Sequence, residues 1–286
     1  MKESVGKPTI AAVLLTADRE INYYERSLQS ILKQSTPPDE LLIIDVGSDI
    51  DLSAVKETLT RKIISNNIAI KYIRTENTPN SRNEAIENTD CQYISFIDDD
   101  DEWYYNKLET QLKRASPNAI VISKYDVENG TCPVPDHIPV DKKTILGSNW
   151  MGSTSFPLIS VSVLRHIGGF NKKMQSNQEW EMWMRVVDDF EVLSSNPKVG
   201  IKHTSPQMIS RNIKKRRSGW LSLYKIHFND YVKHPVELSI SLGYCYRNML
   251  ELKAYFSSII AFMAFGLSII YKTVWEFLKG KKSNTG

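Results

Sequence analysis

The stretch at residues 93–103 reads YISFIDDDDEW. Its first half is an apolar run typical of a buried strand, and its second half places five neighbouring carboxylates where that strand ends. Such carboxylates repel one another, so without a counter-ion some of them would hold protons at neutral pH. A divalent cation removes this conflict, and hard oxygen ligands suit Mg²⁺ or Mn²⁺. The stretch therefore predicts a metal-binding strand end, with Asp98 and Asp100 on one side of the chain and Asp101 turned the other way.

Two other interpretations of the acidic cluster remain open. A run of charges is often a solvated loop. A calcium loop between two helices would need a glycine at its sixth position, counted from Asp98, but Trp103 stands there and a strand precedes it. The position of the cluster directly after a buried strand favours the metal site over both alternatives.

Strands and helices alternate on both sides of this stretch. Buried strands are expected at residues 10–15, 41–44, 68–73, 93–97 and 119–123, and helices around residues 24–32, 55–63, 80–87 and 178–187. The alternation predicts an α/β fold, a Rossmann-like and mostly parallel sheet flanked by helices. Ligands of such sheets bind beyond the carboxyl ends of the strands. Since Thr16, Asp45 and the aspartates at 98–101 stand at strand ends, we expect them to meet in one crevice.

Composition limits the partners and the compartment. The 286 residues are 41% hydrophobic, enough for one large α/β domain with an appendage or for two modest domains. A formal charge of +3, from 36 Lys and Arg against 33 Asp and Glu, is too even to indicate nucleic-acid binding. The first apolar run has about six residues and is too short for a signal peptide. With three scattered cysteines, these features predict a cytoplasmic protein that does not bind nucleic acid.

The C-terminal part has a different character. From about residue 218 the sequence is helical and rich in aromatic residues, and residues 254–271 form an uncharged stretch of 18 residues. At ~1.5 Å per residue a helix of this length reaches roughly 27 Å, the lower limit for crossing a bilayer. A membrane span, an interfacial or re-entrant helix and a helix packed on the protein all remain open. The basic run at 214–217 favours contact with anionic lipid. We therefore expect two parts, residues 1–217 and a membrane-associated helical region at residues 218–286.

Several sequence blocks together resemble family 2 glycosyltransferases with the GT-A fold. The resemblance covers roughly residues 8–215. It rests on LLTADR at 14–19, SILKQS at 30–35, LIIDVGS at 42–48, SRN at 81–83, the acidic cluster, GGFN at 168–171 and QEWEMW at 178–183. Each block alone is weak, but their order and spacing in one chain are typical of the family.

The resemblance implies a nucleotide-sugar site. Thr16 and Asp45 would line the pocket for the base and ribose, and Arg82 would lie beside the nucleotide. Asp98 and Asp99 would hold the sugar nucleotide, and Asp100 and Asp101 would bind the metal. Two departures from the family pattern are Leu15, where a proline is usual, and Val46, where a second aspartate often contacts the base.

Structural roles for the same residues stay open at this point. Asp45 could be a turn residue at a strand end, and Thr16 a capping or turn hydroxyl. Arg82 could pair with Glu84 or Glu87 on its own helix.

Sugar transfer with inversion needs a base that takes the proton of the acceptor hydroxyl. The resemblance implies that this base lies in QEWEMW, and the spacing helps to choose between its two glutamates. Glu179 and Glu181 lie about 200° apart on a helix, and Glu181 is correctly spaced to pair with Arg185. This leaves Glu179 as the candidate base, with Trp180 and Trp183 as walls for the acceptor sugar. Alternatively, the glutamates only stabilise the start of the helix, and the tryptophans belong to the core.

Cations would stabilise the departing diphosphate. The resemblance implies that His203 completes the metal site, although a lone histidine is often structural. Arg211 and Lys215 are the candidate contacts to the leaving group.

The sequence thus predicts an inverting, metal-dependent glycosyltransferase that uses Mn²⁺ or Mg²⁺. It would move a hexose or N-acetylhexosamine from a nucleotide diphosphate sugar, with a UDP-sugar favoured, to a lipid-linked saccharide acceptor. The family implies surface polysaccharide assembly of the O-antigen or capsule type, at the cytoplasmic face of the inner membrane. Two alternatives are an inactive sugar-nucleotide-binding scaffold and a metal-dependent nucleotidyltransferase. The latter should carry a glycine-rich loop after the first strand, and residues 15–18 lack glycine.

Overall fold

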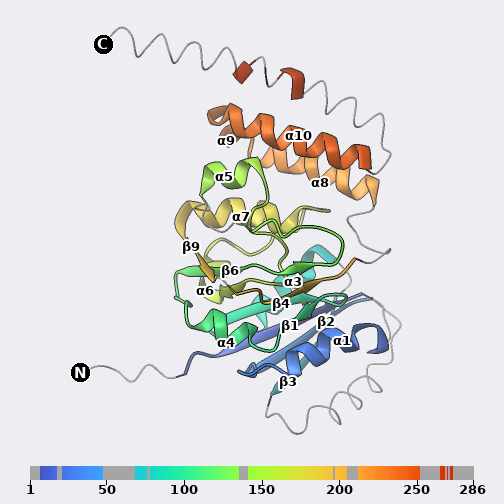
Figure 1. The fold of residues 1–286 in the computed structure, drawn as a ribbon, viewed down its shortest axis with the longest axis vertical. Helices are drawn as coiled ribbons and strands as arrows, with labels where there is room; N and C mark the ends of the chain where they lie inside the picture. Colours follow the sequence, from blue (N-terminus) through green and yellow to red (C-terminus); the bar gives the residue numbers. More distant parts are fainter. Residues whose placement is uncertain are drawn as a thin grey trace, which may run out of the picture.

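A central sheet of seven strands organises the protein. The computed structural model describes residues 7–17, 21–47, 68–75, 78–134, 141–195, 197–204, 212–251, 265–267, 269, 271 and 272. The strands of the central sheet are β1 (Ile10–Thr16), β2 (Glu40–Val46), β3 (Ala69–Thr75), β4 (Tyr93–Asp98), β6 (Ala119–Ser123), β8 (Leu158–Ser160) and β9 (Glu191–Ser195). Their order is β3-β2-β1-β4-β8-β6-β9, and only β8 runs antiparallel to its neighbours. The predicted α/β fold with a mostly parallel sheet is confirmed (Figure 1).

The register of the sheet brings the acidic strand ends together. All seven residues of β1 are buried, because this apolar strand lies inside the sheet with β2 on one side and β4 on the other. Thr16 of β1 is the register partner of Asp45 in β2, and Leu15 is the partner of Asp98 in β4. Three segments that are far apart in the sequence therefore end side by side, as the strand pattern predicted.

Helices cover the sheet. They are α1 (Ile21–Leu32), α3 (Thr78–Glu87), α4 (Lys107–Leu112), α5 (Lys142–Gly147), α6 (Val161–His166) and α7 (Gln178–Asp189). The face predicted for the first helix is confirmed, since Tyr24, Leu28, Ile31 and Leu32 are all buried. The helix expected around Val55, Leu59 and Ile63 lies outside the described residues. In Figure 1, α5 and α7 lie between the sheet and a layer of C-terminal helices.

A second, small sheet lies next to the acidic cluster. Its strands are β5 (Glu102–Trp103), β10 (Gly200–Lys202) and β7 (Asp126–Val127), in the order β5-β10-β7. The pairing is close at Gly200, where an added Cβ would lie 2.4 Å from the carbonyl oxygen of Glu102. Because β10 pairs with the strand that follows the four aspartates, Lys202 and His203 come to lie beside the cluster.

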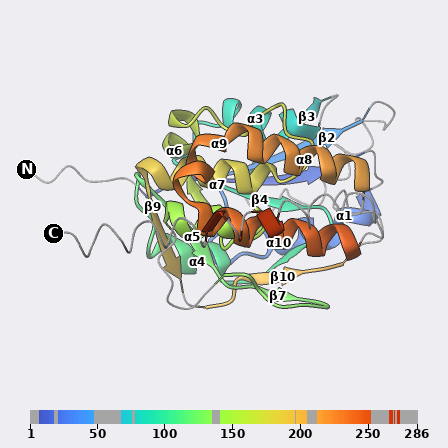
Figure 2. The ribbon, with the colours of Figure 1, turned by 90° about the horizontal axis from the view of Figure 1, so that it is seen from above.

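The C-terminal helices pack on the rest of the protein. They are α8 (Ile213–Ile226), α9 (Phe228–Lys233) and α10 (Pro235–Glu251), and Figure 2 looks onto this layer. The ring of Trp220 in α8 stands edge-on to Trp180 of α7, with centroids 5.1 Å apart. The hydroxyl of Tyr231 donates to the carbonyl oxygen of Leu146 at 3.1 Å. The boundary expected at residue 217 falls inside α8, so the helical region begins no later than Ile213.

Within the part of the chain that the structure describes, no helix combines the length and the apolar character that a membrane crossing requires. Most of the uncharged stretch at 254–271 lies outside the described residues. One described residue of that stretch, Phe265, lies against α10, where a Cβ added at Gly243 would be 3.3 Å from its ring.

Gly219 allows α8 to approach the start of α7 closely. A Cβ at this position would lie 2.0 Å from Oγ of Ser176 and 2.7 Å from its carbonyl oxygen. We expect Gly219→Ala to lower the free energy of unfolding by about 1–3 kcal/mol, because the backbone has to move to make room. Urea denaturation would measure this loss.

Gly147→Ala is the matched control for this variant. A Cβ at Gly147 would meet Ile240 at 3.5 Å, an ordinary contact. We expect this variant to be as stable as the wild type or more stable. Equal destabilisation by both substitutions would contradict the importance of the close approach at Gly219.

Candidate active site

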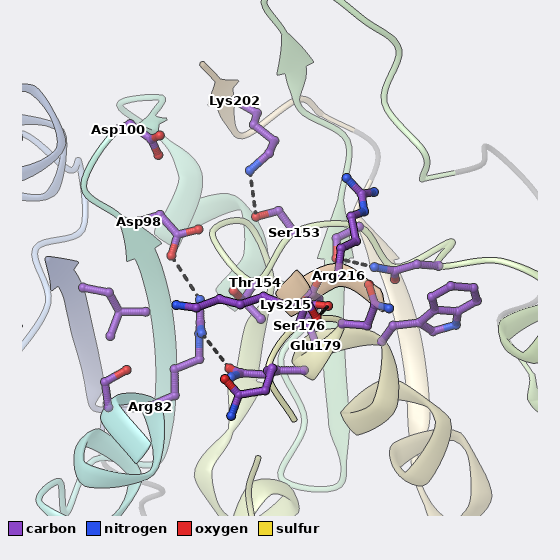
Figure 3. A pocket seen from close by; sticks show the side chains of 18 of the residues that line it. Arg82, Asp98, Asp100, Ser153, Thr154, Ser176, Glu179, Lys202, Lys215 and Arg216 are labelled. Atoms are coloured by element: carbon purple, nitrogen blue, oxygen red, sulfur yellow. Dashed lines mark hydrogen bonds and ion pairs between the residues drawn. The ribbon is translucent and has the colours of Figure 1, made fainter. Parts of the chain in front are cut away.

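A cleft of about 690 Å³ opens over the carboxyl ends of β1, β2 and β4. Its walls also come from α3, from the start of α7, from the end of β10 and from the C-terminal helices α8 and α10 (Figure 3). Most of the predicted site residues line it: Thr16, Arg82, Asp98, Asp99, Asp100, Glu179 and Lys215. Asp45, Asp101 and His203 do not line the cleft, and Arg211 lies outside the described residues.

Arg82 links the acidic strand end to α7. One of its guanidinium nitrogens is 3.1 Å from Oδ1 of Asp98, and another donates to Oε1 of Gln178 at 3.2 Å. The alternative that Arg82 pairs with Glu84 or Glu87 is therefore wrong, since its carboxylate partner comes from β4. This bridge fixes one side of Asp98 and leaves a positive charge at the cleft wall.

Thr16 and Asp99 form a second connection at the strand ends. The Thr16 hydroxyl donates to Oδ2 of Asp99 at 3.1 Å, and both side chains are buried. From α1, the Ser27 hydroxyl is 2.9 Å from the carbonyl oxygen of Asp99 and 2.6 Å from that of Asp101. The turn that carries the aspartates is therefore held by side chains on its inner side.

Asp45 is buried below the cleft, which corrects its prediction as a lining residue. It is fully buried, and its Oδ2 accepts a hydrogen bond of 2.7 Å from the hydroxyl of Tyr72. Tyr72 stands two residues before Arg74, the register partner of Asp45, so its side chain lies on the same face and reaches the carboxylate. Burial and this hydrogen bond raise the pKa of Tyr72 above its usual value. Val46, the next residue, lines the cleft instead.

Asp101 also turns away from the cleft. Its side chain is fully buried, Oδ1 accepts a hydrogen bond from the backbone N–H of His203 at 3.2 Å, and Oδ2 accepts no hydrogen bond from the described residues. The ammonium of Lys202 lies 3.6 Å from Oδ2. Burial raises the pKa of Asp101 to about 7, although the positive charge of Lys202 opposes this.

Lys202 is a cleft residue that sequence reasoning missed. Its ammonium lies 3.5 Å from Oγ of Ser153 and faces the carboxylates of the acidic cluster (Figure 3). Burial lowers the pKa of this amine, but Asp101, Asp98 and Asp100 outweigh burial and raise the pKa above its usual value. The only signal in the sequence was the strand-like pattern before His203.

The structure does not gather the predicted metal ligands Asp100, Asp101 and His203 into one set. Among the described residues there is no group of three or more His, Cys, Asp or Glu side chains that could hold a metal ion. Nε2 of His203 is 3.7 Å from Glu102 and Nδ1 is 3.7 Å from Glu128. The reason is the short strand β10, which turns His203 towards β5 and β7.

Part of a metal site still fits the cleft. Mg²⁺ and similar ions are commonly held by one or two carboxylates together with substrate phosphates and water. Asp98 and Asp100 line the cleft, and these two carboxylates fit an ion that arrives with a diphosphate. Asp101 and His203 do not line the cleft and are not part of this donor set.

The two glutamates at the start of α7 have different surroundings. Glu181 is 1% exposed, and Arg185 donates to both of its oxygens at 2.9 and 2.8 Å. Burial raises the pKa of Glu181, but His227 and Arg185 outweigh it and hold the pKa below its usual value. Glu179 lines the cleft, and its carboxylate has no hydrogen bond or ion pair within the described residues. The predicted pairing of Glu181 with Arg185 is confirmed.

Only some of the tryptophans and basic residues near Glu179 line the cleft. Trp180 lines the cleft, whereas Trp183 is fully buried in the core, so its prediction as a wall of the site is wrong. Lys215 and Arg216 of α8 line the cleft on the side of Glu179. Arg216 is held by a hydrogen bond to Oδ1 of Asn248 in α10. The C-terminal helices thus supply one wall of the cleft.

The fold and the cleft place this chain among the α/β proteins that bind a ligand beyond the carboxyl ends of a parallel sheet. Residues 13–168 match the model of glycosyl transferase family 2. The chain belongs to this family, which does not support the nucleotidyltransferase alternative.

Bacterial relatives share parts of the sequence. An uncharacterised glycosyltransferase of Rickettsia conorii, RC0461, is 33% identical over 125 residues, which are 43% of this chain and 20% of that protein. The chain thus spans about a fifth of the length of this relative. WcaA of Escherichia coli, named for colanic acid biosynthesis, is 24% identical over 85% of this chain and 90% of its own. WfgD of Escherichia coli, named as a UDP-Glc:α-D-GlcNAc-diphosphoundecaprenol β-1,3-glucosyltransferase, is 23% identical over 59% of this chain and 66% of its own.

The fold matches a solved glycosyltransferase structure. Residues 1–349 of Staphylococcus aureus TarS, in complex with UDP-GlcNAc, superimpose with a TM-score of 0.58 at 13% identity. The match covers 93% of this chain and 92% of the TarS chain. The predicted GT-A fold is confirmed.

Proposed function

We propose that this protein is an inverting glycosyltransferase of surface polysaccharide assembly. It would transfer a hexose or N-acetylhexosamine from a UDP-sugar to a lipid-linked saccharide. Family membership supports the reaction class, and the functions for which WcaA and WfgD are named support the pathway and the lipid-linked acceptor. The UDP-GlcNAc bound to TarS supports the donor. The observation that carries the proposal is the carboxylate of Glu179, which has no hydrogen bond or ion pair with the described residues and shares one cleft with the acidic cluster.

Glu179 acts as the base. Its carboxylate takes the proton of an acceptor hydroxyl while the hydroxyl oxygen forms a bond to the anomeric carbon of the donor sugar. The bond from that carbon to the diphosphate breaks at the same time, so the configuration inverts. Arg82 connects α7 to β4 through Gln178 and Asp98, which holds the base and the donor site in a constant relation.

Cations of the chain stabilise the leaving diphosphate. Lys202 lies on the side of the acidic cluster, Lys215 lies on the side of α8, and Arg82 lies between the strand ends and α7. Positive charge placed where negative charge develops lowers the barrier. A Mn²⁺ or Mg²⁺ ion, held by Asp98 and Asp100 together with the diphosphate, would supply further charge neutralisation.

The C-terminal helices form the acceptor side of the cleft in this proposal. α8 and α10 line the cleft next to Glu179, opposite the strand ends that would hold the nucleotide. We place the protein at the cytoplasmic face of the inner membrane, where a lipid-linked acceptor and a soluble donor meet. The division into a nucleotide-sugar part and an acceptor part follows the start of α8 at Ile213 rather than residue 217.

A donor panel tests the reaction. We expect the purified full chain to bind a UDP-sugar in calorimetry, to hydrolyse it slowly with release of UDP, and to do both better with Mn²⁺ than with EDTA. Nucleoside triphosphates without a sugar serve as controls for unspecific phosphate binding. Failure to bind any sugar nucleotide, with or without Mn²⁺, would contradict the proposed function. Equal binding in Mn²⁺ and EDTA would contradict the metal requirement alone.

A further inference from the structure

The segment that contains α8 and α9 has a local excess of positive charge. Residues 212–235 contain six Lys and Arg and one acidic residue, a net charge of +5, whereas the whole chain carries +3. The rest of the chain is therefore net acidic. α8 itself contains no acidic residue. Such a local concentration attracts an anionic surface, although the overall charge is nearly balanced.

Helix α8 has two different sides. Lys215, Arg216 and Trp220 line the cleft. On the other side, residues spaced by three and four positions are all exposed and so form one stripe: Lys214, Arg217, Leu221 and Lys225. Leu221 is 61% exposed within this basic stripe.

Helix α9, which follows α8 after a single residue, adds exposed apolar side chains. Phe228 and Val232, one turn apart, are 63% and 45% exposed. Oδ2 of Asp230, the acidic residue of this segment, lies 3.2 Å from the ammonium of Lys142 and 3.2 Å from Nδ1 of His227. We define the docking face by its basic and apolar members: Lys214, Arg217, Leu221, Lys225, Phe228 and Val232.

Exposed apolar residues gather at this end of the molecule. Of the fourteen large hydrophobic side chains that are exposed in the described chain, only Tyr23, Ile70 and Tyr105 precede residue 213. Cations mixed with exposed Leu, Phe and Val are typical of helices that lie in a membrane interface. Nucleic acid would match the cations but would leave the aliphatic side chains uncovered.

We propose that the docking face binds the surface of an anionic lipid bilayer. Lys214, Arg217 and Lys225 pair with anionic headgroups, and Leu221, Phe228 and Val232 enter the boundary between headgroups and acyl chains. Because the other side of α8 lines the cleft, docking holds the cleft about one helix diameter, roughly 10 Å, from the headgroups. One part of this proposal rests on the proposed function, namely that the cleft of the docked protein faces a saccharide attached to lipid. The docking itself does not need the transfer reaction.

Vesicle sedimentation of the full chain tests the docking face. We expect binding to vesicles of phosphatidylcholine and phosphatidylglycerol, weaker binding at high salt, and little binding to phosphatidylcholine alone. Lys214→Gln with Arg217→Gln should lower partitioning about 30-fold. Leu221→Ser with Phe228→Ser should lower it about tenfold or more.

The matched control is Lys113→Gln with Arg114→Gln, two exposed cations at the end of α4, far from the C-terminal helices in Figure 1. This variant should bind vesicles like the wild type. Thermal unfolding and UDP binding, measured without lipid, should be unchanged in the docking-face variants, which shows that they are folded. Equal binding to both vesicle types would overturn the proposal, as would wild-type binding by both docking-face variants. Binding to RNA but not to anionic vesicles would also overturn it. If vesicles bind but no sugar nucleotide does, the docking stands and the proposed function fails.

Discussion

Glu179→Gln should lower turnover by about 10²–10⁴-fold and leave donor affinity unchanged. The amide has nearly the shape of the carboxylate but cannot take a proton from the acceptor hydroxyl. Since Glu179 has no hydrogen bond or ion pair in the described chain, its replacement breaks no contact that holds the fold. Turnover with a lipid-linked acceptor and calorimetry with a UDP-sugar measure the two quantities separately.

Glu181→Gln is the matched control two residues further along α7. Its carboxylate is buried and bound by Arg185, so the variant should lose about 3 kcal/mol of unfolding free energy. Folded molecules of this variant should keep turnover. If the protein were an inactive scaffold, Glu179→Gln would change no reaction. A larger loss of turnover in Glu181→Gln than in Glu179→Gln would contradict the choice of Glu179 as the base.

Lys202→Met should lower kcat/KM by about 10²–10³-fold, because the cleft loses a cation placed beside the acidic cluster. The loss of affinity should depend on the phosphate groups of the ligand. We expect the affinity for UDP to fall about tenfold or more and the affinity for uridine to stay the same. Calorimetry with UDP, UMP and uridine measures this dependence.

Three further variants separate an effect on binding from an effect on folding. Lys202→Met leaves Asp101 buried without its cation, so the double variant with Asp101→Asn removes both charges and should restore stability but not UDP affinity. Lys202→Arg keeps the charge and should retain part of the affinity. Lys198→Met changes an exposed lysine that pairs with Asp126 outside the cleft and should have no effect on UDP. Equal losses for UDP and uridine in Lys202→Met would show that the lysine only supports the fold.

Local patterns in the sequence carried much of the site. The positions Thr16, Asp98 and Asp100 were found because strand ends of a parallel sheet lie on one edge, and all three line the cleft. Helix geometry separated Glu179 from Glu181, since a pair four residues apart lies on one face. These inferences needed only regular geometry within one element or between adjacent strands.

Contacts between distant segments explain the errors and the omissions. Arg82 has possible partners on its own helix, but its carboxylate partner comes from β4. Asp45 stands at a strand end like Thr16, but its carboxylate accepts a hydrogen bond from Tyr72 of the neighbouring strand. In both cases the competing partner is distant in the sequence and close only after the sheet has formed.

The alternation of strands and helices, the acidic strand end and the separation of Glu179 from Glu181 follow from residue periodicity, which is a local property of the chain, whereas the order of the strands in the sheet is decided by the tertiary structure. The positions of Lys202 and His203 do not follow from periodicity, and neither does the wall that α8 and α10 add to the cleft. They depend on β10 pairing with β5 and β7, and on α8 packing against α7 at Gly219. Short strands and glycine contacts leave no periodic pattern in the sequence, because contacts with distant segments stabilise them. The partner of β10, for example, is β5, about a hundred residues earlier in the chain.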